Sequence, residues 1–289
     1  MLKIEGLSKT FENFSLNDIN VRLEPGKIMG IIGDNGSGKT SIINLIMGLY
    51  KPTSGKIELY GKEIEDDPVA YKNDIGFVYD NLTFYPNLKL KDYKRIISMF
   101  YKNFDEKVYD MYFDNFNLDP EEKIKNLSKG QCEKVMISTA LSHHAKLLIL
   151  DEPIYGLEKS VRKELIRIFK EYIKEENGSV IISTHNVSEL EEIYDHIVYL
   201  DRGSVLFDLK KKDIIRDFRV VRSDSETLAL MKDNIIGIDR YKRYSEALIN
   251  IGDSEEIRDL LRSADCHKIK NPDIEDLIHY YQEGGAFNV

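Results

Sequence analysis

The residues best suited to chemistry form the octapeptide GDNGSGKT, Gly33 to Thr40. It fits the pattern G-x-x-x-x-G-K-[ST], ends the apolar run KIMGIIG and precedes a segment with helical apolar spacing, SIINLIMGLY. Glycines let backbone N–H groups face phosphate oxygens, Lys39 can reach the β- and γ-phosphates, and Thr40 can bind Mg²⁺. A glycine-rich structural turn is the alternative, but the flanking strand and helix favour a nucleotide site. The predicted nucleotide-binding residues are Gly33, Asn35, Gly36, Ser37, Gly38, Lys39, Thr40 and Ser41.

A second set of candidate residues lies in LLILDEP, Leu147 to Pro153. Its apolar residues indicate a buried strand, and Asp151 stands at the C-terminal strand end, where ligands bind in parallel sheets. Asp151 is placed to hold Mg²⁺ through water, and Glu152 is the candidate to polarise an attacking water. An acidic pair alone is more typical of a solvated loop. Its position after a buried strand, downstream of a phosphate-binding loop, favours the catalytic interpretation.

A third motif, LSKGQ at Leu127 to Gln131, precedes this strand and by itself resembles ordinary helix capping. Together the three motifs resemble the ATP-binding cassette (ABC) ATPase family, whose signature is usually LSGGQ; here Lys129 replaces the first glycine. The resemblance implies a head-to-tail dimer in which each ATP lies between the P-loop of one subunit and the signature of the other. Ser128 and Gly130 would then contact the γ-phosphate across the interface, and Gln131 is assigned to the same site.

Two further residues match family elements in the expected order. His185, in SVIISTH, follows a predicted strand as the family's switch histidine does. It would contact the γ-phosphate and, as a catalytic residue with Glu152 and Lys39, help orient the attacking water. Phe11, in LSKTF, matches the aromatic residue that stacks on adenine, and Phe14 is the alternative. Both assignments depend on the resemblance, because an isolated histidine or phenylalanine is more often structural.

The sequence departs from the family pattern at two positions. The Q-loop glutamine normally follows a strand such as IGFVY, and here that residue is Asp80. A carboxylate can approach Mg²⁺ through water, but it cannot donate a hydrogen bond as an amide can. Glu158 stands where the family usually has aspartate, so its contact across the interface is expected to shift. Because neither change removes the P-loop lysine, the acidic pair or the histidine, the sequence still predicts hydrolysis.

The arrangement of strands and helices must bring these motifs together. A β-rich start and strands alternating with helices predict an α/β fold with a mostly parallel sheet covered on both faces, an N-terminal antiparallel β subdomain and a helical subdomain at about residues 84–140. Ten aromatic residues from Phe84 to Phe116 have mostly helical spacing. They either fill the core of the helical subdomain or form a groove for a partner. The resemblance assigns residues 1–209 to an ABC ATPase domain of the P-loop NTPase class.

Residues 210–289 are predicted to form an accessory α+β domain. FRVVR, SETLALMKD, GIDRYKRYS, ALINIG and SEEIRDLLRSA give the order β-α-β-β-α, which suggests a ferredoxin-like unit. The last predicted helix, PDIEDLIHYYQEG, resembles the tail of ABC-2-type exporter ATPases, particularly short bacterial cassettes often encoded beside a GntR-type regulator. This unit is interpreted as a structural extension, with a regulatory or dimer-reinforcing role as the alternative.

Composition and charge limit the partners. The 289 residues include 41 basic and 50 acidic side chains, and this net charge of −9 argues against a nucleic-acid partner. Two cysteines indicate a reducing compartment, and no apolar run is long enough to span a bilayer. The sequence therefore predicts a cytoplasmic protein on the inner face of the cell membrane, working with separately encoded transmembrane permease subunits and a second ATPase subunit, in a homodimer or a heterodimer.

The predicted function combines these points: an ATP- and Mg²⁺-dependent ATPase subunit of an ABC transporter that powers export. Two alternatives stay open from the residues alone. One is an ABC ATPase that does not serve transport. The other is a nucleotide-sensing module with little turnover, which the substitutions at Asp80 and Glu158 would favour.

Overall fold

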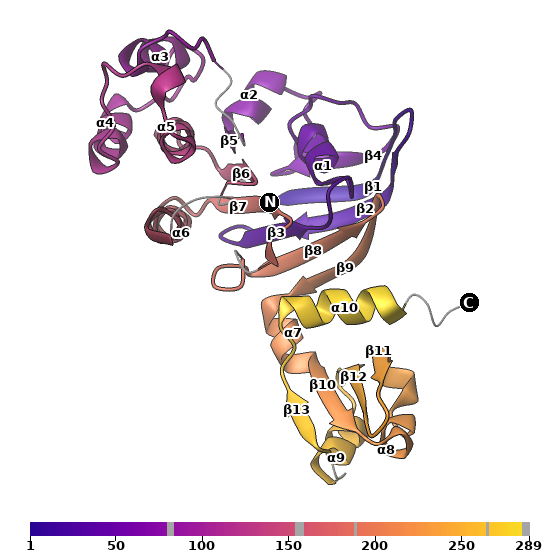
Figure 1. Cartoon of the computed structure of the whole chain (residues 1–289). Helices are drawn as coiled ribbons and strands as arrows, with labels where there is room; N and C mark the ends of the chain where they lie inside the picture. The colour runs from indigo at the N-terminus through magenta and orange to yellow at the C-terminus, as the bar shows by residue number, and fades with distance from the viewer. Residues whose placement is uncertain (80–83, 154–158, 188–189, 264–265, 285–289) are drawn as a thin grey trace.

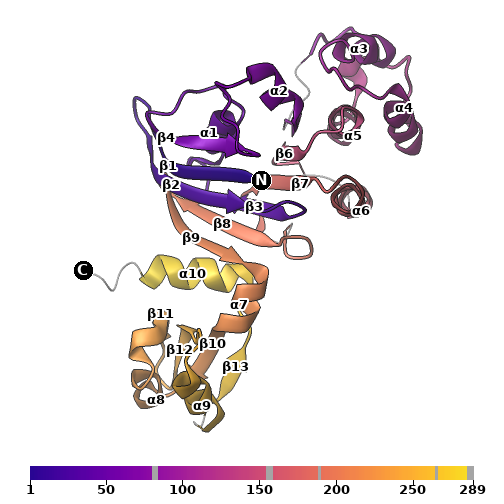
Figure 2. The same ribbon diagram turned by 180° about the vertical axis from the view of Figure 1, so that it is seen from behind.

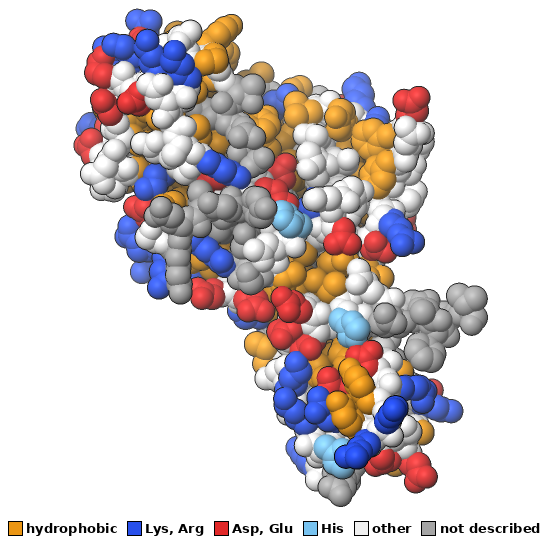
Figure 3. All heavy atoms as spheres, in the orientation of Figure 1, with side chains coloured by type: hydrophobic (Ala, Val, Ile, Leu, Met, Phe, Trp, Pro, Cys, Tyr) orange, Lys and Arg blue, Asp and Glu red, His pale blue; other side chains and the backbone are white. Residues whose placement is uncertain are grey.

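The computed structural model describes residues 1–79, 84–153, 159–187, 190–263 and 266–284. Figures 1 and 2 show two parts: a main body that carries strands β1 to β9, and a smaller C-terminal unit that carries helices α7 to α10 and strands β10 to β13. Over the face seen in Figure 3, basic and acidic side chains are interspersed. Within the described ranges, no helix has the length and apolar character needed to cross a membrane.

A six-stranded sheet with the order β5-β6-β7-β3-β8-β9 forms the centre of the main body. Its strands are β3 (Ile28–Ile32), β5 (Ile75–Val78), β6 (Leu147–Asp151), β7 (Ser179–Thr184), β8 (His196–Asp201) and β9 (Ser204–Lys210). Every neighbouring pair is parallel except β8 and β9. Continuous apolar runs suit these strands because both faces are covered. The carboxyl ends of β3, β6 and β7 meet at one edge, where parallel sheets bind ligands.

A second, antiparallel sheet and one helix complete the N-terminal part. The sheet has the order β2-β1-β4, and its strands are β1 (Leu2–Thr10), β2 (Ser15–Leu23) and β4 (Ser54–Leu59). Helix α1 (Lys39–Ile46) begins directly after the P-loop and shares an apolar core with this sheet through Ile42, Ile43 and Ile46. The mixed, mostly parallel core and the antiparallel sheet confirm the predicted α/β class.

Helices on the far side of β5 form the aromatic-rich subdomain (Figure 1). They are α3 (Leu90–Ile97), α4 (Glu106–Asn115) and α5 (Lys129–Ser142). Helix α2 (Pro68–Asn73) precedes β5 and packs through Tyr71 with the N-terminal core, and α6 (Lys159–Glu176) leads to β7. Tyr93, Tyr109 and Phe113 are buried, so part of the aromatic set fills the core as predicted. Tyr85 and Phe100 stay 74% and 70% exposed, and they leave an apolar surface on this subdomain.

The C-terminal unit is built on a four-stranded antiparallel sheet with the order β11-β12-β10-β13. Its elements are α7 (Lys211–Asp217), β10 (Phe218–Ser223), α8 (Ser225–Ala229), β11 (Ile235–Arg240), β12 (Ser245–Asn250), α9 (Glu255–Ser263), β13 (Lys268–Lys270) and α10 (Ile274–Gly284). From β10 to β13 the chain follows the β-α-β-β-α-β order of the ferredoxin-like motif. Val221 and Ala247 pack with Leu228 of α8 on one face, and Leu248 packs toward α10 on the other.

Candidate functional site

The P-loop curls tightly between β3 and α1. Gly33 and Gly38 have backbone φ angles of 158° and 114°, which residues other than glycine rarely adopt. A Cβ atom on Gly33 would lie 2.4 Å from the carbonyl oxygen of Leu200, and one on Gly38 would lie 2.6 Å from a methyl carbon of Leu16. Both glycines are therefore required by the packing as well as by the turn. The structure places Gly33, Asn35, Gly36, Ser37 and Gly38 between β3 and α1, and Lys39, Thr40 and Ser41 in the first turn of α1.

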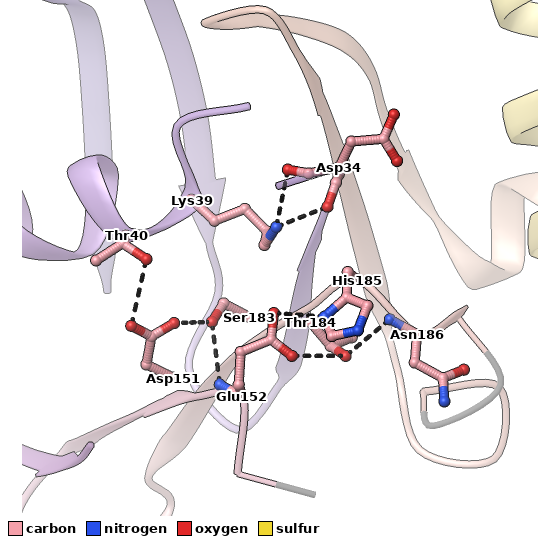
Figure 4. Close-up of polar contacts among 10 residues, drawn as sticks. Asp34, Lys39, Thr40, Asp151, Glu152, Ser183, Thr184, His185 and Asn186 are labelled. Carbon is pink, nitrogen blue, oxygen red and sulfur yellow. Dashed lines mark hydrogen bonds and ion pairs between the residues drawn. The ribbon is translucent and has the colours of Figure 1, made fainter. Parts of the chain in front are cut away.

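Lys39 lies inside this loop. Its Nζ donates hydrogen bonds to the carbonyl oxygens of Gly33 at 2.6 Å and Asp34 at 3.1 Å (Figure 4). Burial lowers the pKa of Lys39, while the charges of Glu152, Asp151 and Asp34 act in the opposite direction. A phosphate group in the loop would supply the negative charge that this buried cation lacks.

Asp151 meets the P-loop at the carboxyl end of β6. Thr40 Oγ1 donates to Asp151 Oδ2 at 3.4 Å, and Ser183 Oγ donates to the other carboxylate oxygen. A hydroxyl and a carboxylate side by side are the oxygen ligands that Mg²⁺ prefers. The donor set therefore fits Mg²⁺, with Thr40 and Asp151 as the residues that would hold it.

Glu152 is held by the neighbouring strand β7. Its backbone N–H donates to the Ser183 carbonyl at 3.1 Å, and its φ of 53° lies in the left-handed region, which is uncommon for a side chain of this kind. One carboxylate oxygen, Oε1, lies 3.0 Å from Nδ1 of His185, and the other lies 3.5 Å from the Thr184 hydroxyl. The structure thus brings together Lys39, Asp151, Glu152 and His185 (Figure 4).

Ser183 and Thr184 contact the acidic pair, and the sequence interpretation did not identify them. Ser183 is fully buried and touches Asp151 through its hydroxyl and Glu152 through its backbone carbonyl. The Thr184 hydroxyl accepts a hydrogen bond from the backbone N–H of Asn186 at 3.0 Å while it contacts Glu152. The sequence held a signal, because two hydroxyl side chains follow the apolar run Val180 to Ile182 and immediately precede His185.

The signature motif lies apart from this cluster. Ser128 is exposed and caps α5, since its Oγ accepts from Gln131 N at 3.3 Å and Gln131 Oε1 accepts from Ser128 N at 2.9 Å. Figures 1 and 2 show α5 packed with α3 and α4, away from α1 and the P-loop. Ser128, Gly130 and Gln131 are therefore not brought to the P-loop of their own chain.

Phe11 and Phe14 form an aromatic group beside the P-loop. Their ring centroids are 6.2 Å apart, and Phe11 also meets Tyr50 edge-on at 5.5 Å. A Cβ atom on Gly38 would lie 3.0 Å from the tip of the Phe14 ring, so Phe14 is the ring that packs on the loop. Asp80 and Glu158, the two departures from the family pattern, lie outside the described residues.

A P-loop at the carboxyl edge of a mostly parallel sheet, with an acidic pair at the carboxyl end of β6 on the same edge, defines a nucleotide-binding ATPase of the P-loop class. The family model described as "ABC transporter" matches residues 16–155. The bacitracin transport ATP-binding protein BcrA of Bacillus licheniformis is 29% identical over 260 residues, which cover 87% of this chain and 84% of that protein. The energy-coupling factor transporter ATP-binding protein EcfA2 of Ligilactobacillus salivarius is 31% identical, with coverages of 71% and 75%.

Solved structures agree with these relatives. One described as the ATP-binding subunit of an ABC transporter superposes with a TM-score of 0.69 at 28% identity, covering 75% of this chain and 92% of that one. The ATP-binding cassette MJ0796, in a dimeric post-hydrolysis state with ADP and Pi, shares the fold with a TM-score of 0.65 at 24% identity, covering 73% and 98%. The chain belongs to the ABC transporter ATP-binding family and is an ABC ATPase.

Proposed function

We propose that the chain is the ATPase subunit of an ABC transporter, and that two copies bind ATP between them and power export through separate membrane subunits. The observation that carries the ATPase assignment is the convergence of Lys39, Thr40, Asp151, Glu152 and His185 at one sheet edge. On the inner face of the cell membrane, the ATPase subunit would couple ATP hydrolysis to conformational changes in the membrane subunits of the exporter.

The geometry supports a division of labour during hydrolysis. Glu152 would accept a proton from the attacking water, because its carboxylate is held between the His185 ring and the Thr184 hydroxyl. His185 would orient that carboxylate, and Lys39 would stabilise charge on the phosphates. When bound by Thr40 and Asp151, Mg²⁺ supplies further neutralisation of phosphate charge.

The exposed N-terminus of the signature helix, α5, supports a dimer. Ser128 and Gln131 fix the first turn of α5 by a reciprocal pair of hydrogen bonds, so the N-terminal N–H groups of this 14-residue helix are presented in a defined direction. Because this helix end is far from the P-loop of the same chain, a second subunit would have to supply the γ-phosphate contact from Ser128 and Gly130. MJ0796, a chain of the same fold, is dimeric.

An apolar groove supports a membrane partner. It has a volume of about 490 Å³ and lies between β5, α3 and α5. Its lining residues are Met47, Phe77, Tyr79, Phe84, Tyr93, Ile97, Tyr101, Met136 and Thr139. Tyr79 is 48% exposed, so the groove is open to solvent beyond the end of β5. A short helix from a membrane subunit, with its apolar side toward the groove, is the partner that this surface fits.

Two relatives match most of the chain, including part of the C-terminal unit. BcrA, whose name states bacitracin transport, and YtrB of Bacillus subtilis each match over 260 residues, which is 87% and 89% of this chain. Their similarity therefore extends beyond the predicted boundary at residue 209 into the C-terminal unit. We propose this boundary between an ABC ATPase domain and an accessory domain.

Two measurements test the proposal. The purified wild type should hydrolyse ATP in the presence of Mg²⁺; a protein that binds ATP with no turnover would favour the nucleotide-sensing alternative. Co-expression with a multi-spanning membrane protein encoded in an adjacent reading frame should give a complex. Tyr79→Arg should weaken co-purification, whereas Tyr241→Arg, a tyrosine of similar 52% exposure in the C-terminal unit, should not. Equal recovery of both variants with the membrane protein would contradict the groove assignment.

A further inference from the structure

The P-loop rests against the hairpin formed by β8 and β9. Tyr199 on β8 pairs in register with Ile32, the last strand residue before the loop. The carbonyl of the next residue, Leu200, closes the space beside Gly33, and Gly203 N donates to the Ser37 carbonyl at 3.0 Å. The hairpin thus touches the loop at its beginning and its middle. A shift of this hairpin would therefore displace the backbone that cradles phosphates.

The same hairpin is held from its other side by α10 of the C-terminal unit. Gln282 Nε2 donates a hydrogen bond to the Tyr199 hydroxyl at 3.0 Å. Tyr199 stacks on Phe207, its pairing partner on β9, with ring centroids 5.4 Å apart. Tyr281 of α10 then packs on Phe207 at 4.9 Å. Figures 1 and 2 both show α10 alongside β9, between the main body and the sheet of the C-terminal unit.

The Tyr199 side chain also lies within electrostatic range of the P-loop. Burial raises the pKa of Tyr199 to about 12, and the charges of Asp34 and Asp201 contribute in the same direction. Asp34 is the P-loop residue whose carbonyl accepts from Lys39, and Figure 4 shows its carboxylate pointing away from Lys39, toward the side where α10 passes. The hydroxyl that Gln282 binds is thus neutral at pH 7 and close to the loop.

Helix α10 also packs into the C-terminal unit. Leu277 and Tyr280 are buried in the same apolar cluster as Leu248 of β12, and the Tyr280 hydroxyl donates to Glu246 at 3.3 Å. One helix therefore contacts the C-terminal sheet through one set of side chains and the hairpin behind the P-loop through another. A displacement of the C-terminal unit would be carried directly to β8.

We infer that Tyr199 and Gln282 are positioning residues through which the C-terminal unit sets the geometry of the P-loop for ATP. The inference rests on the proposed ATP site. Its consequence is specific to nucleotide binding, because Glu152 and His185 follow β6 and β7, which make no hydrogen bond with α10 among the described residues. Loosening the contact should raise KM for ATP and leave kcat close to the wild-type value.

Steady-state ATP hydrolysis by the full-length chain tests the inference. Tyr199→Phe and Gln282→Ala each remove the same hydrogen bond, so each should raise KM about two- to tenfold, the range for one such bond. The double variant should be no worse than the more affected single variant, because both changes remove one interaction. Tyr280→Phe is the matched control. It removes a tyrosine hydroxyl that is also on α10, but this hydroxyl contacts Glu246 of the C-terminal unit and not the main body.

The outcomes separate the possibilities. An unchanged KM in both variants would overturn the inference, and so would an equal rise in Tyr280→Phe, since that result indicates general loosening of the C-terminal unit. A fall in kcat with unchanged KM would also contradict it. Lys39→Met tests the underlying site independently: if that variant binds ATP normally, the proposed ATP site fails, whatever the behaviour of Tyr199 and Gln282.

Discussion

Nδ1 of His185 lies 3.0 Å from Oε1 of Glu152, although the two residues are 33 positions apart in the chain. The pairing arises because β6 and β7 are parallel neighbours, with Asp151 in register with Ser183. Glu152 directly follows β6 and His185 directly follows β7, and the left-handed backbone at Glu152 helps aim its carboxylate. The proposed general base, Glu152, and the ring proposed to orient it, His185, are thereby held by two neighbouring strands.

Replacing Glu152 by Gln tests the role of this carboxylate. The amide keeps the size of the side chain but cannot accept a proton, so ATP hydrolysis should fall about 10²- to 10⁴-fold while ATP binding is retained. An ATP-bound dimer should then accumulate and be visible by size-exclusion chromatography. Glu121→Gln, an exposed carboxylate paired with Lys89 and Lys91, is the control and should turn over ATP normally. Near-normal hydrolysis by Glu152→Gln would refute the assignment.

The Ser183 hydroxyl should matter because it orients Asp151. Ser183→Ala removes a hydrogen bond to a predicted metal-binding carboxylate, and such changes lower activity or metal affinity about 10- to 100-fold. The expected result is a higher Mg²⁺ concentration for half-maximal ATPase activity. Ser138→Ala is matched in burial, but the Ser138 hydroxyl donates only to the Lys134 carbonyl within α5, at 2.8 Å. The same Mg²⁺ dependence in both variants would argue against a specific role for Ser183.

The sequence was sufficient for features that depend on local patterns. GDNGSGKT, LLILDEP and LSKGQ each combine an element boundary with polar residues, and the structure places them at a strand–helix turn, a strand end and a helix N-terminus. Continuous apolar runs indicated the parallel strands, because strands buried on both faces of a sheet consist of apolar residues. The α/β class could therefore be predicted from short segments.

Other features depend on contacts between distant segments, which no local pattern reports. Strand β13 is only three residues long, KIK, and becomes a strand because it pairs with β10. Phe14 packs on Gly38 only because β2 lies beside the P-loop. The contact of Gln282 with Tyr199 joins positions 83 residues apart and follows from how α10 docks. Sequence patterns predict elements better than they predict such tertiary pairs.

The two phenylalanines beside the P-loop should have separable effects. Phe11 is predicted to stack on adenine, so Phe11→Ala should weaken ATP binding about 5- to 150-fold but change the binding of inorganic triphosphate little. Phe14→Ala should weaken both ligands, because that ring packs on Gly38 of the loop itself. Isothermal titration calorimetry with ATP and with triphosphate measures the difference. If the two variants exchange these patterns, Phe14 is the adenine-stacking residue.

Lys39→Met should show two independent consequences of a buried P-loop cation. The variant keeps the apolar stem but loses the charge, so ATP affinity should fall about 10- to 100-fold, the value of one strong charge-assisted hydrogen bond. The second consequence concerns the stability of the folded protein without nucleotide.

Burial lowers the pKa of Lys39 below its usual 10.5. At pH values between the folded-state pKa and 10.5, the unfolded chain therefore binds more protons than the folded chain. The free energy of unfolding of the wild type should therefore rise relative to that of Lys39→Met as the pH increases through this window.

Chemical denaturation at a series of pH values, with Lys62→Met as an exposed-lysine control, measures this difference. A wild type that loses stability relative to Lys39→Met over that range would show that Lys39 is not desolvated in the folded protein. Normal ATP affinity in Lys39→Met would instead contradict its contact with phosphate. Because one result reports on burial and the other on ligand binding, the two roles of this lysine can be judged separately.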